Sequence, residues 1–209
     1  MAAFFVTFEG GEGSGKSTQM RRLATRLAAS GVPCVVTREP GGTPLGEQLR
    51  ALALDAPMPP AAMTEALMIV AARAELVAAV LRPALAEGRT VLCDRYADST
   101  LAYQGGGRGL DAALLQSLNR AATGGLTPDL TLLFDLDPER GLARRAGGGP
   151  TNRLDRESLE FHRRVRARYL ELANAAPERI VVLDAAAPEA DLEEEVWRAV
   201  SSRRPAARR

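Results

Sequence analysis

Phe4-Phe5-Val6-Thr7-Phe8 is followed directly by Glu9-Gly10-Gly11-Glu12-Gly13-Ser14-Gly15-Lys16-Ser17-Thr18. The first of these two segments is a short apolar run of the kind found in buried β-strands. The second contains four glycines, which let the backbone curl tightly. Met20, Leu23 and Leu27 then recur at helical spacing. A strand, a glycine-rich turn and a helix in immediate succession predict an α/β fold.

The glycine-rich turn has the spacing of a phosphate-binding loop, Gly10-x-x-x-x-Gly15-Lys16-Ser17. In such a loop, backbone N–H groups point at phosphate oxygens, and the following helix directs the positive end of its dipole to the same place. Lys16 is expected to reach the β- and γ-phosphates, and the Ser17 hydroxyl is suited to bind Mg²⁺. The predicted ATP-binding residues of the loop are Gly10, Gly11, Glu12, Gly13, Ser14, Gly15, Lys16, Ser17 and Thr18.

Lys16 is the only lysine among 27 basic residues, and the other 26 are arginines. A chain that otherwise uses arginine has kept a compact ammonium group at this one position. The absence of a second lysine excludes switch GTPases, which need an Asn-Lys-x-Asp motif to read the base. It also excludes partition-type ATPases, which carry a second lysine in the loop. Kinases of small molecules and simple ATPases remain.

Four further apolar runs follow, at residues 34–36, 90–94, 130–135 and 180–184. None alternates with polar residues, so we expect strands that are buried on both faces. The sequence predicts a single domain over residues 1–209 with a three-layer α/β fold, in which helices flank a five-stranded parallel sheet. The helical patterns between and after the runs span about 60–87, 111–123, 138–145, 154–175 and 188–203.

A short Arg/Gly lid is predicted at about residues 144–156. This segment carries three glycines and a proline between two helical patterns, with arginines at both edges. Glycine makes such a loop flexible, and the arginines give it positive charge.

Length, charge and composition narrow the classes of protein further. The 209 residues suffice for one core, and an apolar fraction of 46% argues against disorder. A net charge of +1 favours neither nucleic acid nor a membrane as a partner. Cys34 and Cys93 lie in apolar runs and are expected to be reduced core thiols. With no signal-peptide pattern at the N-terminus, a cytoplasmic protein is expected.

Asp94 ends one of the predicted strands and precedes Arg95. Parallel sheets bind ligands at the carboxyl ends of their strands, so Asp94 is predicted to hold Mg²⁺ and Arg95 to bind a phosphate. Asp135 and Asp137 follow the next strand and are alternative metal ligands. For both of them we favour capping of the helix that begins near Pro138.

Several segments of the chain match the signature of a known family in their order and spacing. They are Thr37–Thr43, Asp94–Tyr96, Ser99–Gly109, Pro128–Thr131 and Arg166–Leu170. Through them the chain resembles the bacterial thymidylate kinases over essentially its whole length. This resemblance implies transfer of the γ-phosphoryl group of ATP to dTMP, which gives dTDP and ADP for dTTP synthesis. It also implies Mg²⁺ as a cofactor and a homodimer.

The implied reaction needs no general base. The acceptor is a phosphate monoester with a second pKa of about 6, so it is already a dianionic nucleophile at neutral pH. His162, the only histidine, is accordingly expected to be a solvated helix residue without a partner. Catalysis then depends on aligning two anions and on neutralising the charge of the transferred group. Lys16 and Arg95 are predicted to be catalytic.

The resemblance implies a further catalytic arginine, which some members of the family carry inside the loop. Loop positions 11–14 contain no arginine here, so this cation is expected to come from the lid. The resemblance favours Arg153 as the catalytic lid residue, and Arg144 is assigned to ATP binding. Arg145 is a further candidate, whereas Arg156 is expected to be a surface side chain.

The resemblance also implies the residues of the acceptor pocket. Arg50, Arg73 and Arg95 are expected around the phosphate and base of dTMP, Glu39 on the sugar side, Ser99 and Gln104 near the base, and Tyr103 against the deoxyribose, with Glu9 as a further substrate-binding residue. Ile69 occupies the position where the family has a phenylalanine that stacks on thymine. Losing that aromatic contact, worth about 0.5–1.5 kcal/mol, predicts weaker dTMP binding.

Two other functions stay open at this point. One is a related kinase with another acceptor, such as dUMP or a modified pyrimidine monophosphate. The other is a P-loop ATPase that uses hydrolysis to drive a conformational switch. The Asp94-Arg95 pair and the Tyr103-Gln104 segment favour the kinase, because a switch protein has no need of them.

Overall fold

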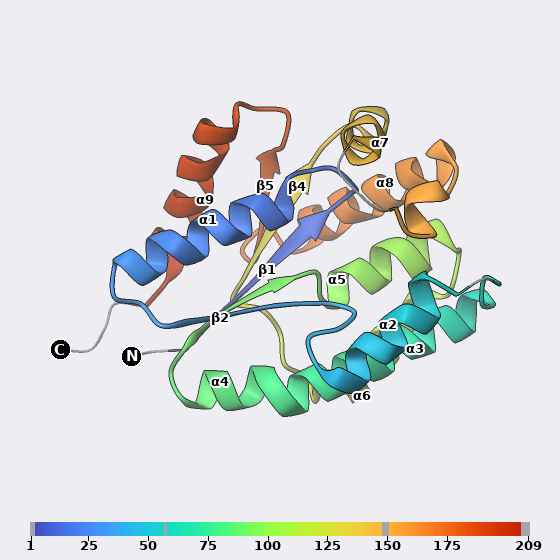
Figure 1. Ribbon diagram of the computed structural model, residues 1–209, viewed down its shortest axis with the longest axis horizontal. Helices are drawn as coiled ribbons and strands as arrows, with labels where there is room; N and C mark the ends of the chain where they lie inside the picture. The colour runs from blue at the N-terminus through green and yellow to red at the C-terminus, as the bar shows by residue number, and fades with distance from the viewer. Residues whose placement is uncertain (1–2, 57, 148–150, 206–209) are drawn as a thin grey trace.

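The computed structural model describes residues 3–56, 58–147 and 151–205. Its centre is a five-stranded parallel sheet with the strand order β2-β3-β1-β4-β5 (Figure 1). The strands are β1 (Phe4–Gly10), β2 (Cys34–Arg38), β3 (Thr90–Asp94), β4 (Leu130–Asp135) and β5 (Ile180–Asp184). The predicted fold class is thereby confirmed.

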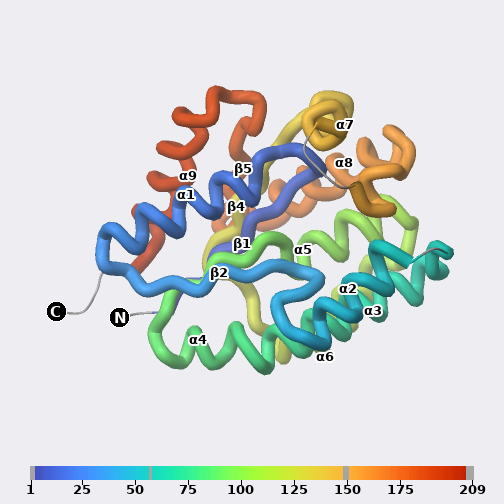
Figure 2. The backbone as a smooth tube through the Cα atoms, in the orientation of Figure 1, coloured from blue at the N-terminus to red at the C-terminus, as the bar shows by residue number. Residues whose placement is uncertain are grey.

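One face of the sheet is covered by α1 (Lys16–Ala29) and α9 (Glu189–Arg203), which lie side by side (Figures 1 and 2). Alternate residues of the central strands point to this face, among them Val6, Phe8 and Leu132. They pack against apolar residues of the two helices, and the resulting cluster contains Met20, Leu23, Leu27, Leu192, Val196 and Val200. The helical spacing seen in the sequence therefore marks the buried side of α1.

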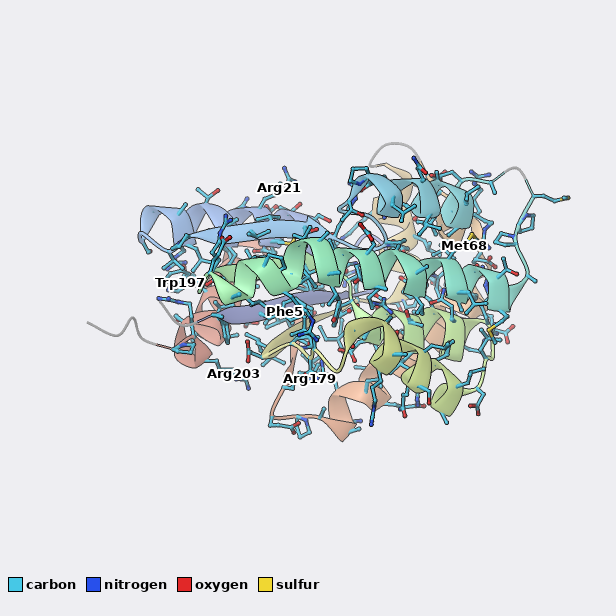
Figure 3. The ribbon with its side chains drawn as sticks, turned by 90° about the horizontal axis from the view of Figure 1, so that it is seen from below. Phe5, Arg21, Met68, Arg179, Trp197 and Arg203 are labelled. Atoms are coloured by element: carbon cyan, nitrogen blue, oxygen red, sulfur yellow. The ribbon has the colours of Figure 1, made fainter. Side chains whose placement is uncertain are left out.

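The opposite face carries the remaining long helices. They are α3 (Ala62–Leu76), which continues through a π-helical turn η1 (Val77–Leu81) into α4 (Arg82–Ala86), and α8 (Leu159–Ala175). Phe5 and Val91 pack against Leu76 and Leu81, and Leu133 packs against Val165 of α8. Figure 3 shows Phe5 beside this helical layer. Two apolar layers thus enclose the sheet.

The expectation that every strand is buried on both faces is wrong for the two edge strands. Val36 of β2 is 45% exposed and Val182 of β5 is 47% exposed, whereas β1 is buried along its whole length. A parallel strand is covered on both faces only where helices pack above and below it. The apolar run of an edge strand reads like that of a central one, so the sequence pattern does not separate them.

Two helical segments lie outside the predicted patterns. The first is α2 (Pro44–Leu54), and the second is α5 (Ala97–Thr100) with its π-helical continuation η2 (Leu101–Gly107). The predicted helix over 154–175 also begins later than expected. A short 3₁₀ turn, η3 (Leu154–Arg156), precedes it, and the Ser158 hydroxyl caps α8 by accepting a hydrogen bond from the Phe161 N–H.

The remaining predicted helices are confirmed as α6 (Ala112–Thr123) and α7 (Pro138–Ala146). Asp137 caps α7 by accepting hydrogen bonds from the N–H groups of Glu139 and Arg140, as the sequence predicts. Asp135 instead forms a bidentate pair with Arg166, at 2.7 and 2.8 Å. The predicted lid, at about 144–156, includes residues 148–150, which lie outside the described residues.

The connections place a crevice at the carboxyl end of β1. The chain leaves β1 towards β2 on one side of the sheet, and later passes from β3 to β4 on the other side of β1. Such a reversal opens a ligand site at the carboxyl ends of the strands involved. The glycine-rich turn and Asp94 lie at this point.

Candidate active site

The glycine-rich turn forms a tight cradle at the start of α1. Gly13 and Gly15 have φ angles of +64° and +84°, in the left-handed region that favours glycine. At Gly13 the backbone also touches α7, because a Cβ there would lie 2.0 Å from the Gly141 carbonyl oxygen. A side chain at this position would therefore be excluded by both conformation and space.

Lys16 folds back over this cradle. Its Nζ donates hydrogen bonds to the Gly10 oxygen at 3.0 Å, the Gly11 oxygen at 2.7 Å and the Ser14 Oγ at 3.1 Å. Burial lowers the pKa of Lys16 to about 8, and the nearby charge of Arg95 lowers it further, against the attraction of Asp94 and Glu12. The ammonium group is thus held at the loop, where a phosphate would give it a compensating charge.

Ser17 and Asp94 meet at the carboxyl ends of β1 and β3. The Ser17 Oγ donates a hydrogen bond of 2.5 Å to Asp94 Oδ2. A hydroxyl and a carboxylate oxygen are the donor types that Mg²⁺ prefers. Among the described residues, no group of three or more His, Cys, Asp or Glu side chains is arranged to hold a metal. A magnesium ion here would therefore depend on these two side chains together with phosphate oxygens.

Arg95 lies at the centre of a dense polar cluster. Its guanidinium pairs with Glu12 Oε1 at 3.0 Å and lies 4.7 Å from the centre of the Tyr103 ring. The Tyr103 hydroxyl donates to the same Glu12 oxygen at 2.7 Å. Burial opposes ionisation of Glu12, but the charges of Arg95 and Lys16 outweigh it and lower the Glu12 pKa to about 2. Glu12 therefore faces Arg95 with its side chain, although the sequence assigned it to the ATP loop.

The backbone of Arg95 is unusual. Its φ angle is +71°, the one positive value at a non-glycine position among residues 3–56, 58–147 and 151–205. A buried carboxylate supports this turn: Glu9 accepts hydrogen bonds from the Tyr96 N–H at 2.7 Å, the Ser99 hydroxyl at 2.6 Å and the Tyr169 hydroxyl at 2.8 Å. Strained backbone of this kind persists where its surroundings fix it, and it is common at functional sites.

Glu9 has a different environment from Glu12. Burial raises the pKa of Glu9 to about 7, and the charge of Asp98 adds to this effect, against hydrogen bonds from Ser99 and Tyr169. Asp98 is paired with Arg179, at 2.6 and 3.1 Å. Glu9 therefore supports the site indirectly, through its hydrogen bonds with the Tyr96 N–H and the Ser99 hydroxyl.

A cavity of about 360 Å³ joins these groups. It extends from the glycine-rich loop along Asp94 and Arg95 to a wall formed by α2, α3 and η2. The predicted residues that line it are Glu12, Gly13, Ser14, Gly15, Lys16, Ser17, Thr18, Glu39, Arg50, Ile69, Arg73, Asp94, Arg95, Ser99, Tyr103 and Gln104. Residues from six separate stretches of the sequence thus meet in one space.

Arg73 is fixed in place at the far end of this cavity. It is 1% exposed and forms an ion pair with Glu39 at 2.6 Å. It also donates hydrogen bonds to Thr100 Oγ1 at 2.9 Å and to the Tyr96 carbonyl oxygen at 3.0 Å. Burial alone would lower the Arg73 pKa, but the charge of Glu39 outweighs it and raises that pKa above its usual value. Because its guanidinium is bonded on several sides, Arg73 forms a rigid part of the cavity wall.

The predicted lid arginines lie in different places. Arg144 donates to the Ala185 carbonyl oxygen at 2.9 Å and lines a second hollow beside the glycine-rich loop, with Gln19 and Leu192. Arg145 lines the main cavity and pairs with Asp155 at 3.1 Å. Arg156 is exposed, as expected.

Arg153 is turned away from the glycine-rich loop. Its guanidinium is bonded to the Glu65 carboxylate and donates to the Ala53 carbonyl oxygen at 2.9 Å. A second carboxylate, Glu157, lies 3.6 Å away. The catalytic role of Arg153 stays a prediction, and it requires the side chain to leave Glu65.

The expectation for His162 is wrong. The side chain is 5% exposed and packs edge-on against the Phe161 ring, with ring centres 5.4 Å apart. Burial lowers its pKa, against the attraction of Glu12. The helical register explains the error, because position 162 lies next to the buried stripe of α8 that contains Phe161, Val165 and Tyr169.

Sequence reasoning missed several residues that the structure places at or beside the cavity. Leu54 and Leu154 line it as aliphatic side chains, and Thr100 and Asn152 as polar ones. Glu65, which is completely buried, binds Gln104 behind the wall. The one signal that the sequence offered for this last residue is a glutamate immediately before the apolar run from Ala66 to Ala72 in α3.

Comparison with known proteins gives one consistent result. A family model described as thymidylate kinase matches residues 8–196. A thymidylate kinase of Deinococcus radiodurans is 56% identical over 95% of this chain and 97% of its own length, and one of Thermomicrobium roseum is 54% identical over 95% of both chains. The crystal structure of thymidylate kinase from Ehrlichia chaffeensis matches with a TM-score of 0.79 and 34% identity, over 96% of this chain and 99% of that one. This chain therefore belongs to the thymidylate kinase family and is a phosphotransferase that converts dTMP to dTDP with ATP.

Proposed function

We propose that ATP and dTMP occupy the two ends of the 360 Å³ cavity, with their phosphates meeting between Lys16 and Arg95. The observation that carries this assignment is that both cations line one cavity with Asp94 and Ser17. The reaction brings two anions together, so the barrier falls when fixed positive groups stand where they meet. The triphosphate of ATP lies on the loop from Gly10 to Thr18, and Arg144 contributes from the adjoining hollow.

The acceptor phosphate attacks as a dianion, and no side chain is assigned as a general base. Its second pKa is about 6, so it is deprotonated at neutral pH. The residues instead position the reactants and neutralise their charge: Lys16 neutralises the β- and γ-phosphates, and Arg95 holds the acceptor phosphate in line. Glu12 and Glu9 keep the Arg95 side chain and backbone in place.

We assign Ser17 and Asp94 as the residues that would hold Mg²⁺. Their oxygens lie 2.5 Å apart, and Mg²⁺ is commonly bound by few protein ligands together with substrate phosphates. When bound, the ion would offset charge on the β- and γ-phosphate oxygens. Arg153 supplies a further cation once it leaves Glu65, which makes it the catalytic residue of the lid in this proposal.

The base and sugar of dTMP occupy the end formed by α2, α3 and η2. Ile69 and Leu54 supply an apolar surface for the ring, and Tyr103 lies along the sugar. Glu39 Oε1 is enclosed and accepts no hydrogen bond from the described residues, which suits a sugar hydroxyl as donor. Arg50, Arg73, Ser99 and Gln104 complete this end.

The test is an assay of ADP release from Mg-ATP with each nucleoside monophosphate in turn and with none. Release should require an acceptor and should be fastest with dTMP. Preference for dUMP or a modified pyrimidine would identify another acceptor, and release without any acceptor would identify a simple ATPase. The variant Lys16→Arg should lose most activity although it keeps the charge, because a planar guanidinium does not fit the position of the ammonium.

We further propose that the enzyme is a homodimer that acts in the cytoplasm. Large apolar side chains are exposed on three helices that pack in the order α2, α3, α6: Leu52 is 57% exposed, Leu67 47% and Leu114 42%. A second copy of the chain is the occupant proposed for this surface. Within the described parts of the chain, no helix is both long and apolar enough to span a membrane.

A further inference from the structure

A carboxylate lies directly behind the wall of the acceptor end. Glu65 of α3 is 0% exposed, and its Oε1 accepts a hydrogen bond of 2.7 Å from the Gln104 Nε2 of η2. Gln104 is itself 1% exposed and lines the cavity. The two residues are 39 positions apart in the sequence, so the fold alone brings them together.

The cations around Glu65 keep it an acceptor. Arg108 donates to Glu65 Oε2 at 3.2 Å, and Arg153 binds the same oxygen. An ionised carboxylate has no proton to donate, so it binds only the NH₂ end of a neighbouring amide. Glu65 therefore fixes which way round the Gln104 amide stands.

The amide oxygen is left as the free end. No described residue donates a hydrogen bond to Gln104 Oε1. This oxygen is also not completely enclosed by protein atoms. Because Nε2 is held by Glu65, the part of Gln104 that is open to the cavity is an acceptor. A ligand group at this point must donate a hydrogen.

Pyrimidine bases differ in whether ring position 3 can donate a hydrogen bond. Thymine and uracil carry an N–H at ring position 3, whereas cytosine has an unprotonated nitrogen there. An acceptor at the wall forms a hydrogen bond with the first two and meets a lone pair of the third. A site built to bind one hydrogen-bonding pattern rejects the opposite one strongly, because a buried polar group is then left unpaired.

We propose that Glu65 is a specificity-determining positioning residue, which holds the Gln104 amide so that its oxygen reads the ring N–H of the acceptor base. The proposal rests on the placement of the base at this end of the cavity, as given above. Glu65 itself does not touch the substrate. Its effect is exerted through Gln104 and excludes cytosine nucleotides.

The experiment compares kcat/KM for dTMP and dCMP in Glu65→Gln. A neutral amide at position 65 can donate as well as accept, so Gln104 is free to turn its NH₂ towards the base. The ratio of kcat/KM for dTMP over dCMP should fall at least about tenfold, the equivalent of one hydrogen bond. The variant Glu65→Asp keeps an acceptor and should retain the ratio even where both rates fall.

Glu157→Gln is the matched control. Glu157 belongs to the same ion cluster, since it pairs with Arg108 at 2.6 Å and Arg153 at 3.6 Å, but it does not bind Gln104. This variant should leave the ratio of kcat/KM for dTMP over dCMP unchanged. The effect of disrupting the ion cluster is thereby separated from the effect of losing the amide orientation. Thermal unfolding of each variant checks that the comparison concerns folded protein.

A second background tests the route through Gln104. Gln104→Met removes the amide and should lower the ratio by itself, and adding Glu65→Gln to it should cause no further change. The proposal is overturned if Glu65→Gln slows both substrates equally, or if it changes the ratio just as much in the Gln104→Met background. If the unmodified enzyme phosphorylates neither nucleotide, the placement of the substrates is overturned instead, and the two failures are thus distinguishable.

Discussion

Glu9 at the end of β1, Glu12 in the glycine-rich turn and Lys16 at the start of α1 differ sharply in how their charges are balanced. Glu12 faces two cations and keeps a pKa of about 2, while Glu9 is enclosed by hydroxyl and N–H donors and has a pKa of about 7. Lys16, bonded to neutral oxygens, has its pKa lowered to about 8. The protein thus leaves the charge of an ammonium group only partly compensated at the place where we propose that a phosphate binds.

This state of Lys16 predicts that nucleotide binding takes up a proton at alkaline pH. Above pH 8 most of the amine is neutral in the free enzyme, and the phosphates of a bound nucleotide favour its charged form. We expect uptake approaching one proton per bound non-hydrolysable ATP analogue at pH 8.5, little from Lys16 at pH 7, and weakening affinity as the pH rises through 8. Calorimetry in buffers of different ionisation enthalpy measures this directly.

Lys16→Met is the control for the proton measurement, since it removes the titrating group. Its proton uptake should be close to zero at both pH values. Equal uptake by Lys16→Met and the unmodified enzyme at pH 8.5 would assign the proton to another group.

Ile69 is the residue for which the sequence predicts a cost in dTMP binding. It lines the cavity next to Leu54 and is 7% exposed. Ile69→Phe would add an aromatic contact worth about 0.5–1.5 kcal/mol, so the KM for dTMP should fall roughly two- to tenfold with little change in kcat. Steady-state kinetics measure both. A KM that is unchanged or higher in the variant would contradict this account.

At the level of helices and loops, the close approach of α7 to the glycine-rich turn has a direct functional meaning. A Cβ on Gly141 would lie 2.4 Å from the Glu12 carbonyl oxygen, so the helix touches the loop backbone to backbone. Overpacking of this kind shifts the backbone and costs about 1–3 kcal/mol.

We therefore expect Gly141→Ala to raise the KM for ATP about tenfold or more, because the displaced loop presents its N–H groups less well. Gly147→Ala, at the C-cap of the same helix, is the matched control, since a Cβ there meets its nearest atom at 3.7 Å, which is ordinary contact. Kinetics with varied ATP at saturating dTMP distinguish the two. Equal KM values for the two variants would show that the contact does not shape the loop.

Most of the strands and helices could be predicted from the sequence. All five strands and most helices follow from apolar runs and helical spacing, because burial dictates both. The N-terminus of α2 also carried a signal in Thr43-Pro44, where the hydroxyl caps the helix and proline occupies its first turn. The segment η2 carried none: its glycines disfavour a helix, yet Gly107 allows the Phe161 ring of α8 to approach, at 2.4 Å from where a Cβ would lie.

Over the chain as a whole, the sequence predicted those parts of the candidate site that belong to a recognisable motif. The loop and Arg95 were identifiable because each follows a strand of a parallel sheet, and Asp94 because it ends one. Partnerships across long separations were not, and Glu65 with Arg153, 88 residues apart, is the clearest case. Which carboxylate holds which cation depends on how α3, η2 and α8 pack, and the local pattern does not encode it.

The assembly of two chains is the prediction that belongs to the entire molecule. A chain of 22.3 kDa should sediment as a dimer of twice that mass. Leu67→Glu would bury a charge in the proposed interface and should shift the enzyme to monomers. Met58→Glu, at an 81% exposed position outside α2, α3 and α6, should stay dimeric. A monomeric unmodified enzyme in sedimentation velocity would contradict the proposal.

Leu154 of η3 packs against the aliphatic cluster of Ala53, Leu54 and Ile69, and it lines the acceptor end of the cavity. This apolar contact holds the segment that carries Arg153 against the wall at which we propose that the base binds. An inhibitor with a pyrimidine head and a hydrophobic arm would touch both sides of this contact, and its affinity should depend on the identity of residue 154. Drug selectivity among these kinases could therefore be sought at position 154 as well as at position 69, since both side chains line the cavity.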